Sequence, residues 1–268
     1  DHVGNSPHGG ADVFSTEMQR PETKRVITQD GATFTTQTTA FDAYAAPTTV
    51  TKSSSLGFSK TELTTYYHNT NVWVIGQVAS VKDQGTGLFP SETTYDPATA
   101  LPTSRKRFGQ LEHTLAYWPD GTLKSVTDGN NHTTSYGSWK RGLPQLVTYA
   151  DNVQESVVVN DRGWITSWNG AAGYATGYQY DSMGRLAVIN YPANDSVAWL
   201  PTTLTFKSVP TAEYGVPGGH WTQTITTGNA KKETVFDARW RPVVIAEYDS
   251  SNKANTQRFT VQRWDHAN

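Results

Sequence analysis

The sequence predicts an all-β protein made of antiparallel strand-turn-strand repeats, and three observations support this fold class. Charged residues make up only 17% of the 268, where about a quarter is typical, and Thr, Ser, Gly and aromatic residues take their place. Short runs of alternating polar and apolar residues recur, whereas apolar residues hardly ever keep a helical spacing over a dozen positions. A turn motif also returns with a period of about 21 residues.

Two segments illustrate the expected strands. Residues 222–227 and 232–236 alternate with a period of two on either side of Gly228-Asn229, which tolerates the positive φ of a tight turn and predicts a hairpin. A meander is predicted from residue 146, with strands over 146–149, 153–159 and 164–168. Its turns are expected at 151–152 and 160–163 because both stretches are rich in Asn and Asp.

The recurring motif is clearest at Tyr180-Asp181-Ser-Met-Gly184-Arg-Leu186. An Asp carboxylate accepts a backbone N–H in such a turn, and the Gly adopts the positive φ. The aromatic residue before Asp is expected to end one strand and pack on the next repeat, while the apolar residue after Gly begins the return strand. Further copies, some looser or without the Gly, lie at 41–48, 95–102, 117–123, 136–144, 159–165 and 236–243.

The spacing of these copies indicates two strands and two turns in each period. Tyr95, Tyr117, Tyr136, Val159 and Tyr180 follow one another at intervals of 22, 19, 23 and 21 residues. The gaps 41–95 and 180–236 span 54 and 56 residues and are expected to hold two or three degenerate units each. A second turn falls midway in several units, at 128–131, 151–152 and 249–252. Because a lone hairpin is marginal in water, such units must stack.

The whole chain, 1–268, is therefore predicted to be a single repeat β domain, with 1–22 as an extended or flexible tail and the clearest repeats over 95–191. With 22 basic and 24 acidic side chains there is no basic footprint for nucleic acid. No apolar run reaches the roughly 20 residues of a membrane helix, so we expect no membrane insertion. The absence of Cys excludes disulfides and thiolate chemistry.

The copies at 180–186 and 117–123, with their regular spacing, resemble the YD repeats of the RHS-repeat family. The resemblance covers 41–262 unevenly and is strongest from 95 to 191. It implies a ribbon of strands that forms a curved sheet or partial hollow β-shell. In bacterial RHS toxins such a shell encloses a toxic polypeptide, and in teneurins related repeats form an adhesive extracellular shell.

The resemblance implies a non-enzymatic structural segment that encloses or presents a polypeptide, either for toxin-cargo encapsulation or as an adhesion scaffold. The expected partners are the remainder of a larger shell, another copy of the chain or an enclosed toxin polypeptide, and the expected location is secreted or cell-surface. The toxin branch cuts its cargo free with aspartates in an Asp-Pro-x-Gly-Leu-type run. No such run occurs here, since Asp96-Pro97 is followed by Ala-Thr and Asp195 lies in Asn-Asp-Ser.

No catalytic, cofactor-binding or metal-binding residue is predicted. The seven histidines have no zinc-type spacing and are expected to be structural or to lie in the tails (His2, His8, His68, His113, His132, His220, His266). Turn capping accounts for every Asp of the repeats without a calcium site. No Gly-x-Ser-x-Gly elbow and no phosphate-binding Gly loop occurs.

The alternative is a secreted all-β carbohydrate-binding or glycan-active module, in which exposed tryptophans stack on sugar rings. The chain has nine tryptophans (Trp73, Trp118, Trp139, Trp164, Trp168, Trp199, Trp221, Trp240, Trp264). Their recurrence beside repeat turns favours packing between neighbouring repeats, where large aromatic side chains bury most area.

Overall fold

The structure is a computed structural model that describes residues 21–193 and 196–265. Within these ranges, the regular structure is β-strand except for the four-residue helix α1 (Lys253–Thr256). Strands β1 to β10, and likewise β11 to β20, pair antiparallel with their neighbours in chain order, which confirms the predicted all-β class and strand-turn-strand repeats. The predicted tail, 1–22, lies outside the described residues apart from its last two positions.

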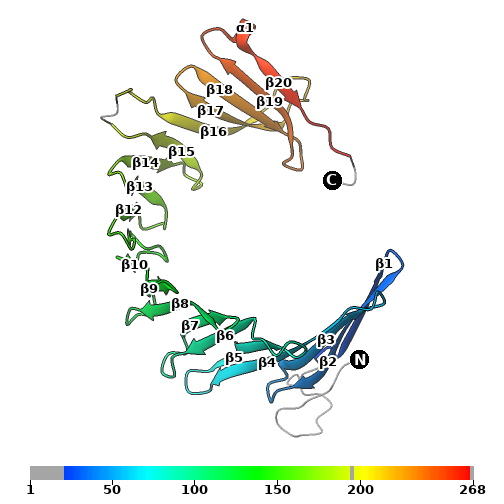
Figure 1. Cartoon of the computed structure of the whole chain (residues 1–268). Helices are drawn as coiled ribbons and strands as arrows, with labels where there is room; N and C mark the ends of the chain where they lie inside the picture. Colours follow the sequence, from blue (N-terminus) through cyan, green and yellow to red (C-terminus); the bar gives the residue numbers. More distant parts are fainter. Residues whose placement is uncertain (1–20, 194–195, 266–268) are drawn as a thin grey trace, which may run out of the picture. The chain divides into compact units, whose positions relative to one another are not determined.

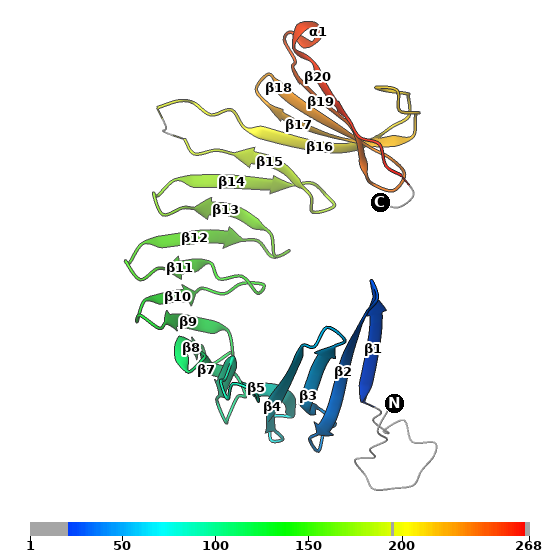
Figure 2. The same cartoon turned by 45° about the vertical axis from the view of Figure 1, so that its right-hand side comes forward.

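The chain divides into two compact units between Ser135 and Tyr136. Figure 2 shows β1 to β4 of the first unit side by side in chain order. Its strands are β1 (Lys24–Gln29), β2 (Ala32–Phe41), β3 (Pro47–Ser54), β4 (Ser59–Asn69), β5 (Val74–Asp83), β6 (Ser91–Tyr95), β7 (Pro102–Arg107), β8 (Gln110–Tyr117), β9 (Leu123–Asp128) and β10 (Thr133–Gly137), the last of which crosses the division.

The second unit continues the same strand order. In Figure 2, β11 to β15 lie one after another in chain order. In Figure 1, the helix α1 lies at the turn between β19 and β20. Its strands are β11 (Leu146–Thr148), β12 (Gln154–Val159), β13 (Ile165–Asn169), β14 (Ala175–Tyr180), β15 (Leu186–Asn190), β16 (Thr202–Val209), β17 (His220–Thr227), β18 (Ala230–Phe236), β19 (Pro242–Asp249) and β20 (Arg258–Val261).

The predicted hairpin and meander are both present, as β17–β18 and β11–β12–β13. Each of the two long gaps between clear motif copies holds two periods. The first, 41–95, contains β3 to β6, and the second, 180–236, contains β15 to β18. Their periods are longer because strands such as β4, with 11 residues, exceed the five or six of the central repeats.

A β-bulge recurs immediately before the motif turns. The pairing register shifts at the last residue of β2, β6, β8, β12, β14 and β18. In β14, for example, Gln179 pairs with Val188 but Tyr180 pairs with Leu186. A bulge adds local twist and turns the side chain at that position. The bulge thus sets the direction of the aromatic residue that precedes Asp.

Burial is intermediate along most strands, and the buried apolar residues gather in β16 to β19. Of the six such residues in the described ranges, four belong to this region: Val209, Val235, Val244 and Ala246. The cross-strand register places Val235 opposite Val244 and Thr222, on one face of the sheet. The β16–β17 connection, 210–219, crosses this face, because Tyr214 contacts Glu233 and Phe259 there.

Candidate functional site

The turn at Asp181 is the best-defined polar site of the repeats. Asp181 Oδ1 accepts the backbone N–H groups of Met183 and Arg185, both at 2.9 Å, and Oδ2 accepts Arg185 Nε at 2.7 Å. Gly184 has a φ of +82° and donates its N–H to the Asp181 carbonyl. The backbone N–H of Arg185, followed by its side chain, lowers the pKa of Asp181. The carboxylate is fully engaged in closing the turn.

The same closure recurs in the other repeats. Asp42 and Asp237 accept the equivalent pairs of N–H groups, and the fourth position of each turn again has a positive φ, at Ala45 and Trp240. In the copy at 159–165 the capping residue is Asn160, whose Oδ1 accepts two N–H groups at 3.0 Å.

Two copies depart from the expectation that every repeat Asp caps its turn at the motif position. Asp161 lies one residue beyond the cap and instead pairs with Lys140 at 2.9 Å, its side chain 92% exposed. In the copy at 117–123, Trp118 occupies the capping position in the backbone, and Asp120 supplies the carboxylate from two residues further on, at 3.0 Å from Thr122 N. Asn160 is accepted because its amide oxygen replaces the carboxylate, and Trp118 because the backbone bonds form the loop while Asp120 supplies the acceptor.

The aromatic residue before Asp contacts the preceding repeat, opposite to the expectation that it packs on the next one. Tyr180 Oη donates to the carbonyl of Ile165 at 2.7 Å, and its ring packs against Trp164 with centroids 5.0 Å apart and planes tilted by 37°. Tyr95 donates likewise to the carbonyl of Val78 at 2.7 Å. The bulge at each tyrosine directs its side chain toward the preceding repeat. Partial burial raises the pKa of Tyr180.

Of the described histidines, His68 contacts a motif Asp. His68 Nδ1 accepts the N–H of Gly76, so Nε2 carries the proton and donates to Asp42 Oδ2 at 2.9 Å. His132 contacts Asp128 within one turn, and His220, with only 3% of its side chain exposed, donates from Nδ1 to the carbonyl of Pro217. His113 lies in β8, while His2, His8 and His266 lie outside the described residues.

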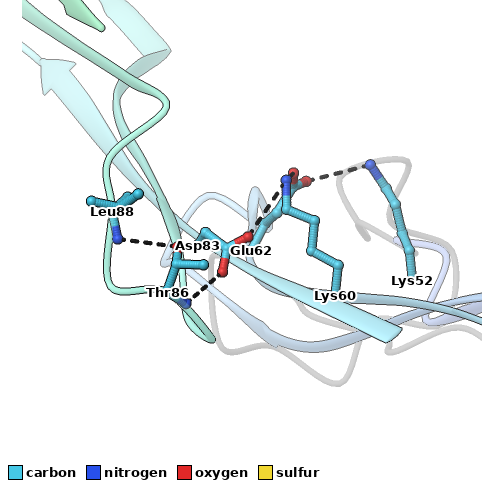
Figure 3. Close-up of polar contacts among 6 residues, drawn as sticks. All are labelled: Lys52, Lys60, Glu62, Asp83, Thr86 and Leu88. Atoms are coloured by element: carbon cyan, nitrogen blue, oxygen red, sulfur yellow. Dashed lines mark hydrogen bonds and ion pairs between the residues drawn. The ribbon is translucent and has the colours of Figure 1, made fainter. Parts of the chain in front are cut away.

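Figure 3 shows a group of charged side chains on β3, β4 and β5. Glu62 accepts Lys60 Nζ at 2.8 Å and Lys52 Nζ at 3.3 Å, and the bond from Lys60 is the main cause of its lowered pKa. Asp83, whose pKa is lowered mainly by the N–H of Thr86, closes the β5–β6 turn. The lysine side chains of these pairs are about half exposed, so the pairs stabilise the strand surface only weakly.

The described residues contain no group of three or more His, Asp or Glu side chains placed to hold a metal ion. Nor does any helix in these ranges have the length and apolar character needed to cross a bilayer. The repeat carboxylates that are brought to the turns accept backbone N–H groups there. These hydrogen bonds stabilise the turns that connect neighbouring strands.

Sequence reasoning missed one polar cluster in the second unit. Tyr214 Oη donates to Glu233 Oε2 at 2.5 Å, and Lys253 Nζ lies 3.1 Å from the same hydroxyl. Burial, then the bond to Glu233, raises the pKa of Tyr214 strongly. Lys253 also lies over the ring of Tyr248, 4.4 Å from its centroid. No sequence signal links these residues, because the long β16–β17 connection brings Tyr214 across the sheet.

The tryptophans divide into two groups. Trp164 and Trp221 pack between strands, the latter 5.2 Å from the ring of Phe206. Trp73, Trp199 and Trp240 are more than half exposed, at 75%, 58% and 56%. Packing against neighbouring rings describes Trp164, Trp221 and also Trp240, which lies 5.5 Å from the rings of Phe206 and Trp221.

Comparison with protein families identifies an RHS repeat over residues 159–196. This match confirms the YD-repeat resemblance for the stretch that contains the Asp181 turn. No curated protein matches the chain in sequence.

Among solved structures, the chain is similar to TcdB2-TccC3-Cdc42, with a TM-score of 0.49 and 11% identity over 93% of this chain and 14% of that one. A Tc holotoxin pore of Photorhabdus luminescens gives a TM-score of 0.49 and 12% identity over 93% of this chain and 13% of that one. TcdB2-TccC3 without its hypervariable C-terminal region gives a TM-score of 0.48 and 12% identity over 92% of this chain and 13% of that one. The chain thus spans about a seventh or less of these chains.

Proposed function

We propose that this chain is a non-enzymatic structural segment of an RHS-repeat β-shell that encloses or presents a polypeptide. The observation that carries the proposal is the use of the repeat side chains. The Asp, Tyr and Gly residues of the motif close turns and join each repeat to the one before it, as Asp181, Tyr180 and Gly184 do. A wall built in this way acts sterically, by keeping its contents from proteases.

The strand β1 supports a further part of the proposal, that the sheet continues into other chain segments. All six of its residues are exposed, Val26 at 51% and Ile27 at 52%. Thr38 N–H donates to the carbonyl of Thr23. Hydrogen-bonded pairs alternate along an antiparallel ladder, so the N–H of Val26 points away from β2. Such an edge is a template for another strand.

The strand β20 offers a second edge of the same kind. Its four residues are exposed, with Phe259 at 52% and Val261 at 65%, and it pairs with β19. The strands that complete these edges belong to the remainder of a larger shell or to another copy of the chain. A toxin polypeptide is the proposed content, and secretion or display at the cell surface is the proposed location.

Substitution at the β1 edge tests the pairing. Val26→Pro removes the outward N–H and leaves the bonds to β2 in place, while Val26→Thr keeps the N–H and serves as its control. In sedimentation velocity, we expect the unmodified chain and Val26→Thr to associate as concentration rises, and Val26→Pro to associate less. Monomers at every concentration for all three would contradict pairing with another copy of the chain.

Enclosure is tested by protease protection of a polypeptide that copurifies with the chain from its source. We expect the polypeptide to resist trypsin while the chain is folded and to be digested after the chain is unfolded in acid. Equal digestion before and after unfolding, or the absence of any retained polypeptide, would contradict enclosure. The result is independent of the edge pairing, because a single chain could retain its content without associating.

A further inference from the structure

A small aromatic pocket lies on the side of the second unit opposite the motif turns. It is lined by Tyr174, Tyr191, Pro192, Trp199 and Thr227 and has a volume of about 430 Å³. Tyr174 lies in the β13–β14 turn, Tyr191 follows β15, Trp199 precedes β16, and Thr227 ends β17. Three aromatic rings from separate segments therefore converge at one edge of the sheet.

The rings are held in place by the sheet. Tyr191 Oη lies 3.0 Å from Thr202 Oγ1, which in turn lies 2.6 Å from Thr227 Oγ1, and Thr202 is only 6% exposed. This chain of hydroxyls anchors the ring of Tyr191. Its centroid is 6.0 Å from that of Trp199, at an interplanar angle of 48°, so the two rings form an open wedge.

The aromatic pocket nonetheless stays open to a ligand. Tyr174 is 55% exposed, Trp199 58% and Tyr191 37%. A positive φ of +80° at Gly173 closes the turn that presents Tyr174. Pockets of a few hundred Å³ with mainly aromatic walls and few polar groups are typical binding sites for small groups.

The chemistry of the walls selects the ligand. None of the five lining residues is charged, so a charged group would lose its hydration without a counter-charge. The hydroxyls of Tyr191 and Thr227 are already hydrogen-bonded through Thr202. A sugar ring stacked on these walls would gain few hydrogen bonds from them, whereas a ring without hydroxyl groups needs none. The walls instead suit a neutral ring with few polar atoms.

We propose that the aromatic pocket binds a prolyl ring of an extended, proline-rich polypeptide. Proline-rich segments adopt the polyproline II conformation without internal hydrogen bonds, and their preformed shape docks into aromatic-lined grooves at low entropic cost. The absence of charge on the pocket walls matches the uncharged prolyl ring. This site is separate from the open strand edges and does not depend on the shell function.

The test uses fluorescence anisotropy of a labelled proline-rich decapeptide added to the full chain, with a Gly-Ser decapeptide as the control ligand. We expect saturable binding of the proline-rich peptide alone. Trp199→Ala and Tyr174→Ala should each weaken it at least about tenfold. Trp73→Ala, which removes a tryptophan that is 75% exposed in the other unit, should leave it unchanged. Affinity should vary little between about 0.05 and 0.5 M salt, because no charge pairs form.

Three results would overturn the proposal: no saturable binding, equal binding of both peptides, or equal binding by Trp199→Ala and the unmodified chain. Saturable binding of neutral oligosaccharides that is lost in Trp199→Ala would assign the pocket to glycans and also overturn it. Trp199→Phe keeps a ring at the wedge and should bind more tightly than Trp199→Ala. Circular dichroism of each variant establishes that the sheet is intact.

Discussion

A Cβ placed on Gly184 would lie 2.6 Å from Cζ2 of Trp164, so the turn of one repeat is closed against the indole of the repeat before it. Trp164 also packs against the ring of Tyr180, which limits its movement away from Gly184. Gly184 is therefore required twice, once by its φ of +82° and once by this close approach. Gly184 thus allows the backbone conformation of the turn and the close contact between two repeats.

Gly184→Ala should destabilise the chain by more than the about 1 kcal/mol expected for a left-handed backbone alone, because the methyl group also meets Trp164. Gly173→Ala is the matched control, with a φ of +80° and no atom within 4 Å of the added Cβ, and should cost only about 1 kcal/mol. Urea unfolding measures both. Equal losses in the free energy of unfolding would show that Trp164 accommodates the added methyl group without destabilising the chain.

Ala45→Gly should stabilise the chain by about 0.5 kcal/mol, because Ala45 has a φ of +60° where other turns have Gly. Ala100, with a φ of +59°, is 2% exposed, so Ala100→Gly also loses a buried methyl group worth about 0.8 kcal/mol. Ala45→Gly should therefore raise the melting temperature and Ala100→Gly should not. The reverse order would contradict this reasoning.

Tyr180→Phe should cost about 1 kcal/mol, because it removes the hydrogen bond to the carbonyl of Ile165 and keeps the ring on Trp164. Tyr95→Phe should cost about as much, because it removes the hydrogen bond to the carbonyl of Val78. Tyr174→Phe, at an exposed ring, should stay within about 0.5 kcal/mol of the unmodified chain. Chemical denaturation distinguishes these cases, and a loss at Tyr174 as large as that at Tyr180 would contradict the role of the bond.

The chain should lose stability in acid. The folded pKa values of the turn carboxyls are lowered, for Asp181 first by the N–H of Arg185. A lowered folded pKa contributes stability that is present above the unfolded value, near 3.9, and is lost as the pH falls from there through the folded value. The turn carboxyls with a lowered pKa are Asp83, Asp96, Asp120, Asp128, Asp181, Asp237 and Asp249. Bonds from lysines also lower the pKa of Glu62 and of Asp161.

Asp181→Asn provides the matching variant for the acid effect. Its amide oxygen accepts the same N–H groups, as Asn160 does in the preceding repeat, but it does not titrate in this range. Asp181→Asn should therefore fall less steeply in stability between pH 4 and pH 2 than the unmodified chain. Unfolding by urea across that range measures the difference, and identical pH profiles would exclude Asp181 as a contributor.

Local patterns predicted much of the fold. Alternation over 222–236 predicted β17 and β18, and the Asp-to-Gly spacing at 181–184 predicted a turn whose Gly has positive φ. These features depend on residues within one hairpin, where the intrinsic preferences of Gly and Asp decide the backbone. The cap at Asn160 in place of Asp161 differs by one residue, because Asn and Asp accept N–H groups equally well there.

The sequence by itself determined the antiparallel strand-turn-strand class and the motif turns, since both follow from interactions between near neighbours. The tertiary structure alone decided that Tyr180 faces the preceding repeat, because the bulge at that residue redirects its side chain. It also decided that Tyr174, Tyr191 and Trp199 meet at one pocket. Their meeting depends on the register of several strands, which no local pattern specifies.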